Sequence, residues 1–191
     1  MKKIKEITRG IGLMSGTSLD GVDLVFVEFT SLNTFKLLQA ETVSYPEDWF
    51  LKLKDIALFE KGSIELKAID VGLGNYFGIL INDFVKKNQL QNIDWIASHG
   101  HTVHHQPEIR YTLQIGCGKE IFKRTGIKTV YDFRSQDVLL GGQGAPLVPI
   151  GDLLLFSEYD YCLNLGLLSD LHHQIAEKKL LLMLVVVILL L

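Results

Sequence analysis

Residues 11–23 constrain the fold most strongly, because they read IGLMSGTSLDGVD and lie between two apolar runs. The runs, residues 7–13 and 22–29, have the composition and spacing of largely buried β-strands. Two such strands joined by Gly, Ser, Thr and Asp predict a hairpin whose tip presents backbone N–H groups and hydroxyls. That tip suits phosphate oxygens, which need many donors at close range and leave no room for a Cβ atom. An ordinary hairpin turn uses the same residue types, so composition leaves both interpretations open.

The rest of the chain alternates between strand-like and helix-like patterns. Apolar residues at helical spacing predict helices over residues 46–57 and 64–85, the second beginning at Ser63, and a short helix over 119–125 closed by Gly126. Glycines within the second helix either loosen it or permit close packing. Further strands are expected over residues 35–43, 93–98, 111–115, 127–131 and 161–165.

Composition narrows the class of protein. A chain of 191 residues is long enough for one well-buried domain and short for two. A formal net charge of -3 gives no electrostatic reason to expect nucleic acid or an anionic membrane as partner. Cys117 and Cys162 lie far apart, which favours neither a zinc site nor a disulfide framework and fits a reducing cytoplasm. The N-terminus does not read as a secretory signal.

Four of the six histidines follow the strand predicted over 93–98, where α/β folds collect ligand-binding groups. Their sequence, HGHTVHHQP over residues 99–107, raises the question of zinc, since imidazole is a common metal ligand. The spacing matches no familiar tetrahedral site, so hydrogen-bonding loop histidines are the favoured interpretation. Cys117 is given no nucleophilic role, because nothing local supplies a base or lowers its pKa.

The densest polar stretch reads DFRSQDVLLGGQGAPLVP over residues 132–149. Phosphoryl transfer to a sugar hydroxyl needs a carboxylate base and donors for the transferring group, and Asp132 or Asp137 could be that base. Arg134 could bind a substrate carboxylate through two N–H groups. The alternative is that Asp137 and Arg134 form an ion pair or cap a helix.

Four motifs in order, GLMSGTSLDGVD, HGHTVHHQP, TLQIG and DFRSQDVLLGGQGAPLVP, resemble those of the anhydro-N-acetylmuramic acid kinases over about residues 10–166. These enzymes belong to the actin, Hsp70 and sugar kinase superfamily. One departure is His101, which stands where glutamine is usual. The resemblance implies an α/β fold: a ribonuclease-H-like (actin-type ATPase) domain with a mixed sheet and flanking helices.

The resemblance also implies a reaction. Members of this family open 1,6-anhydro-N-acetylmuramic acid with water and phosphorylate O6 from ATP, giving N-acetylmuramic acid 6-phosphate in peptidoglycan recycling and amino-sugar catabolism. When the family's roles are carried onto the matching positions of this chain, the expected catalytic base is Asp137, and Asp132 is the second candidate. Mg²⁺ is expected near Asp20 and Asp23. The residues expected to bind the ATP phosphates are Gly16, Thr17, Ser18, Leu19, Asp20, Gly21, Val22 and Asp23. The residues expected to bind the sugar are His99, Thr102, Arg134, Gly142, Gln143 and Gly144. The expected partners are the sugar and ATP, without nucleic acid or membrane, and a homodimer is left open.

The end of the chain departs from the family pattern. Residues 1–166 are expected to form the N-terminal kinase domain, whereas residues 167–191 lose the motifs and end in an apolar run too short to span a bilayer. The family is about twice this length, so the second ATPase domain is expected to be absent and the tail to result from a frameshift or truncation. A buried helix or a partner-binding segment is the competing interpretation. The alternative function is a catalytically inactive half-kinase that binds sugar or a partner.

Overall fold

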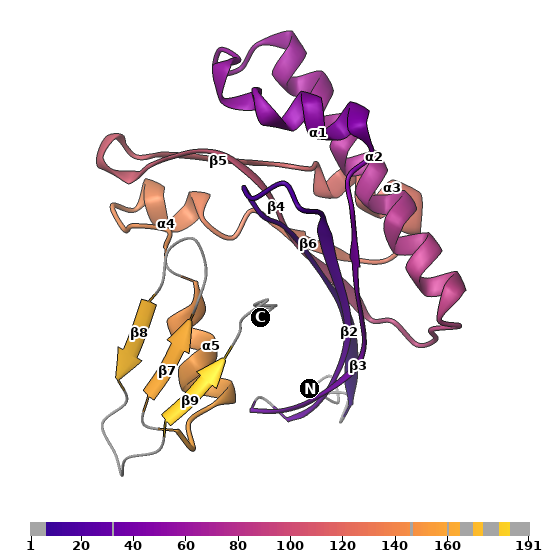
Figure 1. Cartoon of the computed structure of the whole chain (residues 1–191), viewed down its shortest axis with the longest axis vertical. Coiled ribbons are helices and arrows are strands. Elements are labelled where there is room, and N and C mark those ends of the chain that lie inside the picture. The colour runs from indigo at the N-terminus through magenta and orange to yellow at the C-terminus, as the bar shows by residue number, and fades with distance from the viewer. Residues whose placement is uncertain are drawn as a thin grey trace, which may run out of the picture.

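The computed structural model describes residues 7–31, 33–145, 147–159, 161–164, 170–173 and 180–183. Its main sheet is built on the predicted hairpin: β1 (Thr8–Ser15) and β2 (Val22–Ser31) are antiparallel, and β3 (Thr34–Val43) extends them. On the other side of β1 lies the parallel strand β4 (Trp95–Gln106). β6 (Thr129–Tyr131) pairs in parallel with the first part of β4, and β5 (Tyr111–Ile115) is antiparallel to the second part. The mixed sheet and the flanking helices confirm the α/β expectation (Figure 1).

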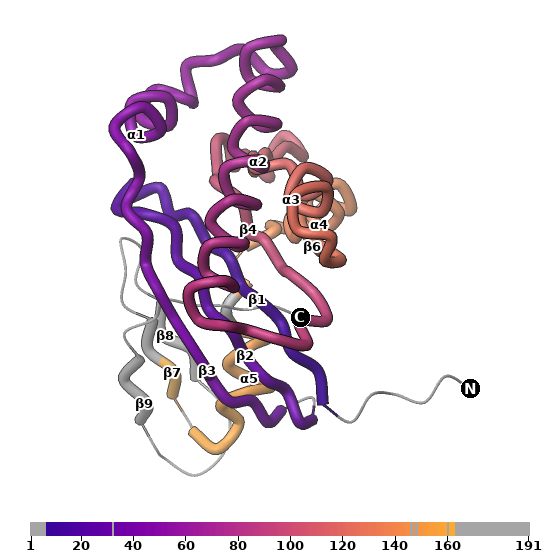
Figure 2. Tube along the Cα trace, turned by 90° about the vertical axis from the view of Figure 1, so that its right-hand side faces the viewer, coloured from indigo at the N-terminus to yellow at the C-terminus, as the bar shows by residue number. Residues whose placement is uncertain are grey.

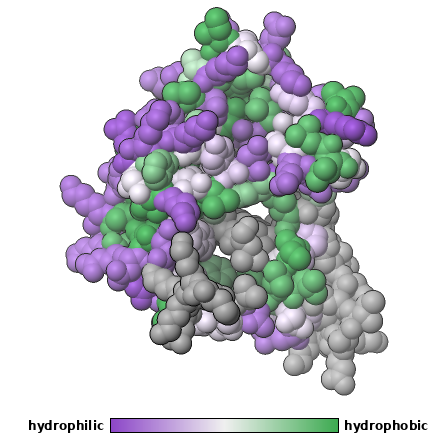
Figure 3. Space-filling view, turned by 180° about the vertical axis from the view of Figure 1, so that it is seen from behind, coloured by the Kyte–Doolittle hydropathy of each residue, from purple (hydrophilic) through white to green (hydrophobic). Residues whose placement is uncertain are grey.

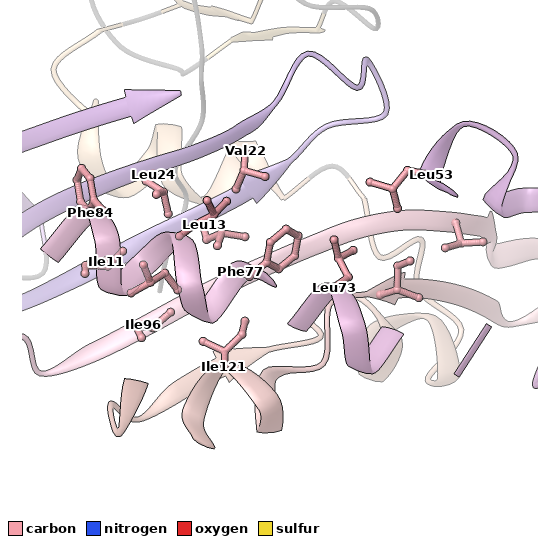
Figure 4. Packing of buried hydrophobic residues seen from close by; sticks show 14 of the residues in the cluster. Ile11, Leu13, Val22, Leu24, Leu53, Leu73, Phe77, Phe84, Ile96 and Ile121 are labelled. Atoms are coloured by element: carbon pink, nitrogen blue, oxygen red, sulfur yellow. The ribbon is translucent and has the colours of Figure 1, made fainter. Parts of the chain in front are cut away.

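Two helices lie over one face of this sheet, α2 (Ile64–Lys87) and α3 (Gly118–Thr125) (Figure 2). α1 (Glu47–Lys54), which is followed by a 3₁₀ turn over Ile56–Leu58, lies beyond the end of the strands and packs beside α2. The core lies between α2 and the strands, and Figure 4 shows Phe77 of α2 directed at the strand residues beside Leu13. Both side chains are at most 1% exposed. Burial of such side chains stabilises each by about 1.5–3 kcal/mol, so this face holds the sheet in place for the candidate site.

The glycines of α2 permit close packing, which settles the alternative posed by the sequence. A Cβ on Gly74 would lie 2.5 Å from the carbonyl oxygen of Cys117, in the turn before α3. The helix begins where the sequence predicts, because the Ser63 hydroxyl accepts a hydrogen bond from the Leu66 amide at 3.1 Å. α2 is therefore a continuous helix that packs tightly on the start of α3.

The prediction that a loop follows residue 98 is wrong. β4 continues through the histidines to Gln106, and residues 101–106 pair with β5. Gly100 makes this possible, because its φ of 73° bends the strand without ending it. The histidines thus lie on a strand, and a 3₁₀ turn over Pro107–Ile109 leads into β5.

Two helices follow β6. α4 (Ser135–Leu139) lies against β5, and α5 (Val148–Leu155), which the sequence did not predict, has proline in its first turn, where no N–H is needed. α5 lies on the side of the main sheet opposite α2, and Phe156 just after it meets Phe35 of β3 edge-on at 6.0 Å (Figure 1).

A second sheet has the order β8-β7-β9, with β7 (Tyr161–Asn164), β8 (Asp170–His173) and β9 (Leu180–Met183). A helix is therefore the wrong expectation for residues 180–183, which pair in parallel with β7. Residues 167–169, 174–179 and 184–191 of the predicted tail, and residue 165 of the predicted strand, lie outside the described residues. Among those described, no helix is long and apolar enough to cross a bilayer.

Candidate active site

Three chain segments come together where β1 and β6 end beside the middle of β4. Leu13 of β1 is level with Ser98 of β4, and Ser98 is level with Tyr131, the last residue of β6. Because the three strands are parallel, β1 and β6 both end beside the histidine stretch of β4, which itself stays in the sheet as the partner of β5. This part of the sheet thus holds the start of the turn over residues 16–21, the histidines of β4 and the stretch that begins at Asp132.

The turn over residues 16–21 is compact and polar. The Leu19 amide donates to the carbonyl oxygen of Gly16 at 3.3 Å, and Leu19 has a φ of 59°. Thr17, Ser18 and Asp20 are exposed, and the Ser18 hydroxyl donates to Asp20 Oδ1 at 2.7 Å. Asp23 lies beyond the turn on β2 and accepts from the Thr42 hydroxyl at 2.6 Å. The turn therefore presents hydroxyls and a carboxylate to solvent.

Arg134 is fixed by two hydrogen bonds. Its Nε donates to Nε2 of His99 at 3.1 Å, and its Nη1 donates to the carbonyl oxygen of Gly144 at 2.7 Å. Nε2 of His99 is thus an acceptor, so Nδ1 carries the proton and donates to the Gly100 carbonyl oxygen at 3.1 Å. Burial, and next the charge of Arg134, lowers the pKa of His99 to about 4. Burial also lowers the pKa of Arg134. A neutral imidazole therefore orients the guanidinium.

Asp137 is held by the same loop. Its Oδ2 accepts from the Gly144 amide at 2.7 Å, and its own carbonyl oxygen accepts from the Gly142 amide at 2.8 Å. A Cβ on Gly142 would overlap the Asp137 carboxylate, and one on Gly144 would lie 2.6 Å from Val138 Cγ2. Glycine at both positions allows the loop to close on the carboxylate, which remains exposed.

The two aspartates have different environments. Asp132, with a φ of 59°, accepts a hydrogen bond at 3.2 Å from the amide of Ser135, the first residue of α4. The helix-cap alternative is not what the structure shows for Asp137 or Arg134, because Asp137 lies within α4 and Arg134, at the N-cap position, makes no side-chain cap hydrogen bond. The ion-pair alternative is not what the structure shows for Arg134, whose hydrogen bonds go to His99 and Gly144.

The remaining predicted sugar residues line the same region. Thr102 is half-buried on β4 and lies opposite Gln114 of β5, while Gln143 is exposed in the glycine loop. Gln114 was not among the predicted site residues. Its Nε2 donates to the Thr112 hydroxyl at 2.8 Å, whereas its buried Oε1 has no hydrogen-bond partner in the described structure. Its place in the TLQIG motif was the signal that could have found it.

Ser15 and Tyr45 were also missed. The Ser15 hydroxyl lies 2.5 Å from the Tyr45 hydroxyl and 2.9 Å from Nδ1 of His101. Burial lowers the pKa of His101 to about 4 and raises that of the Tyr45 phenol above its usual value. No local pattern could reveal this contact, since it joins three segments through a register shift between β1 and β4.

The described residues contain no group of three or more His, Cys, Asp or Glu side chains placed to hold a metal ion. A pocket of about 420 Å³ does occur, but it is lined by Asn33, Thr34, Phe35, Leu155, Phe156, Glu158 and Tyr159. It lies at the start of β3, whereas the candidate site adjoins the end of β3, where Val43 pairs with Val22. The pocket is therefore separate from the site.

Comparisons with known proteins agree with the motifs. Residues 8–180 match the family model described as anhydro-N-acetylmuramic acid kinase. A protein of that name from Mannheimia succiniciproducens is 43% identical, with 84% of this chain and 45% of the relative covered. Those from Shewanella putrefaciens and Pseudoalteromonas translucida are 40% and 37% identical, each over 84% of this chain and over 46% and 44% of the relative. The chain thus spans less than half the length of these curated relatives.

Proposed function

This chain belongs to the anhydro-N-acetylmuramic acid kinase family, and we propose that its site opens 1,6-anhydro-N-acetylmuramic acid and transfers a phosphoryl group from ATP to O6. The observation that carries the proposal is the pair of hydrogen bonds that Gly144 makes with Arg134 and Asp137. Arg134 holds its carbonyl oxygen and Asp137 holds its amide, so one residue fixes a cation and a base relative to each other. Both groups follow β6, and β6 pairs with β4 on the side opposite β1, the strand that leads into the turn over residues 16–21.

The fold supports a ribonuclease-H-like, actin-type assignment. The strands follow the order β3-β2-β1-β4, and both β5 and β6 pair with β4. β3, β1, β4 and β6 are parallel to one another, whereas β2 and β5 run against them. A sheet of this kind binds ligands beyond the carboxyl ends of its parallel strands, which is where the motif segments after β1 and β6 begin. Residues 1–166 then form the N-terminal kinase domain, although the family match runs to residue 180.

Arg134 recognises the carboxylate of the sugar. Nε and one hydrogen of Nη1 are engaged, so Nη2 and the second Nη1 hydrogen remain for a bidentate carboxylate contact. His99 uses both ring nitrogens within the protein and acts through Arg134. Thr102, Gly142, Gln143 and Gly144 complete the predicted sugar contacts, with the Oε1 acceptor of Gln114 nearby.

Asp137 is the base. Its Oδ2 is bound to the Gly144 amide, and its exposed Oδ1 accepts a proton from water as that water attacks the anomeric carbon. The bond from the anomeric carbon to O6 breaks, O6 takes the γ-phosphoryl group of ATP, and ADP leaves. The products are N-acetylmuramic acid 6-phosphate and ADP, with the proton of the water on Asp137.

The ATP phosphates lie on the turn and its flanks, residues 16–23. Asp20 and Asp23 fit Mg²⁺, because this ion is usually held by one or two carboxylates together with substrate phosphates. Each has one oxygen engaged, Asp20 Oδ1 with Ser18 and Asp23 Oδ1 with Thr42. When bound, Mg²⁺ offsets phosphate charge. We expect the reaction to take place in the cytoplasm, where the sugar and ATP are available.

The test is product analysis. The purified chain is incubated with ATP, Mg²⁺ and 1,6-anhydro-N-acetylmuramic acid, ADP is measured by a coupled assay, and the sugar product is identified by mass spectrometry. We expect ADP and N-acetylmuramic acid 6-phosphate in equal amounts. A folded chain that binds the sugar without releasing ADP would refute independent turnover and favour the sugar-binding half-kinase.

A further inference from the structure

The side chains of Tyr45, Ser15 and His101 form a buried chain of hydrogen bonds, here called the Ser15 bridge. Ser15 Oγ lies 2.5 Å from the Tyr45 hydroxyl and 2.9 Å from Nδ1 of His101. Ser15 is 1% exposed and His101 2% exposed, so neither side chain reaches a ligand in solvent. The bridge joins the end of β1, the connection between β3 and α1, and the middle of β4.

The bridge stands where the backbone ladder is irregular. The pairing of β1 with β4 is regular from Gly10 to Leu13, then shifts before Ser15, which is level with His101. Gly100 sits in this shift with a φ of 73°, and a Cβ there would lie 2.5 Å from the Ile115 carbonyl oxygen. Side-chain hydrogen bonds therefore connect the two strands at the point where regular backbone pairing is interrupted.

Two members of the bridge, Ser15 and His101, are close in sequence to residues of the candidate site. Ser15 directly precedes Gly16, the first residue of the turn assigned to the ATP phosphates. His101 is two residues from His99, which accepts the hydrogen bond from Arg134. A short path of covalent and hydrogen bonds thus runs from the turn through Ser15 and His101 to the guanidinium.

We propose that Tyr45, Ser15 and His101 are positioning residues that hold the turn over residues 16–21 at a fixed place relative to Arg134. The expected effect on ATP binding rests on the proposed function, whereas the expected effect on the motion of the turn does not. Tyr45 and Ser15 restrain the N-terminal end of the turn, and His101 ties that restraint to β4. Removal of one hydroxyl frees the turn while the strands stay paired.

The structure offers a matched control in Tyr76. Its ring lies 6.2 Å from that of Tyr45 and stacks on Trp49 at 5.5 Å, so it belongs to the same aromatic group. The bridge, however, uses only the Tyr45 hydroxyl. Tyr45→Phe and Tyr76→Phe each remove one phenol oxygen and keep the ring, but only the first breaks the bridge.

The first measurement is hydrogen exchange of the amides of residues 16–21 in the ligand-free chain. We expect Tyr45→Phe and Ser15→Ala to speed exchange about threefold to tenfold, the factor for loss of one hydrogen bond, and Tyr76→Phe to leave it unchanged. His101→Gln keeps an acceptor for the Ser15 hydroxyl and should exchange more slowly than His101→Leu. Equal exchange in wild type and Tyr45→Phe, or equal acceleration by Tyr76→Phe, would overturn the proposal.

The second measurement is the KM for ATP and for the sugar. We expect Tyr45→Phe to raise the KM for ATP about threefold to tenfold and to change the KM for the sugar less, because the turn holds phosphates. If Tyr45→Phe speeds amide exchange of the turn but the wild-type chain shows no turnover, the proposed function is refuted and the positioning role of the Ser15 bridge is supported. Turnover with unchanged exchange and an unchanged KM for ATP would refute the bridge alone.

Discussion

Nε of Arg134 donates a hydrogen bond to Nε2 of His99 over 3.1 Å, so a histidine on β4 sets the direction of a guanidinium that lies just before α4. The His99 side chain is 9% exposed, and burial together with the charge of Arg134 keeps its imidazole neutral. Arg134 is thus oriented before any ligand arrives, which lowers the entropy cost of binding a carboxylate.

Arg134→Lys should lower kcat/KM for the sugar by about 10-fold to 100-fold, because a lysine ammonium cannot bind His99 and Gly144 and also present two parallel donors. Steady-state kinetics with varied sugar measures this. Arg110→Lys, an exposed arginine at the β4–β5 turn, is the matched control. Similar kcat/KM values for both variants would contradict the role of Arg134.

Gly142→Ala should lower kcat about 100-fold, since a methyl group there overlaps the Asp137 carboxylate and displaces the base. Gly72→Ala is the control, because its Cβ would lie 3.4 Å from Trp49 in ordinary contact. Kinetics and circular dichroism of both variants test the claim. Full activity of Gly142→Ala would show that the placement of Asp137 by this loop does not matter.

Acid should destabilise the fold through His99 and His101. Both have a folded pKa of about 4, below the usual 6.5, so the unfolded state binds more protons between these values. The stability that depends on the two neutral imidazoles is therefore fully present above about pH 6.5 and is lost as the pH falls to about 4. The loss in the free energy of unfolding is on the order of 3 kcal/mol for each imidazole. Urea unfolding across this range measures it. His101→Gln should flatten the pH dependence, and an unchanged pH dependence in this variant would contradict the prediction.

Ser63→Ala should lower the free energy of unfolding by about 1 kcal/mol, because the Leu66 amide loses its side-chain acceptor at the start of α2. Ser63→Asp keeps an acceptor and should stay close to wild type. Chemical unfolding distinguishes them, and equal stability of Ser63→Ala and wild type would show that water replaces the cap without loss.

Local patterns predicted most of the main sheet and its helices. The turn after β1, the cap at Ser63 and the C-terminal Gly126 of α3 each depend on residues adjacent in sequence, which is why they could be predicted. The continuation of β4 could not, because Gly100 beside histidines is typical of a loop. Only the pairing with β5 turns that segment into a strand.

The site was predicted as a set of motifs but not as a set of contacts. Asp137, Arg134 and Gly144 are close in sequence, and the structure joins them through hydrogen bonds. The Ser15–His101 contact spans 86 positions and depends on a register shift that no periodicity reveals. Sequence therefore predicted the candidate residues, while the hydrogen bonds that orient them come from the fold.

The most direct test of the central claim compares ADP release by Asp137→Asn and Asp132→Asn in the presence of the anhydro sugar. Both asparagines keep a side-chain oxygen for the amide that each aspartate now binds, so both variants should retain the local fold. We expect Asp137→Asn to lose about 100-fold to 10,000-fold in turnover, the usual contribution of a general base, and Asp132→Asn to stay near wild type. Wild-type turnover by Asp137→Asn, or its loss in Asp132→Asn alone, would contradict the account.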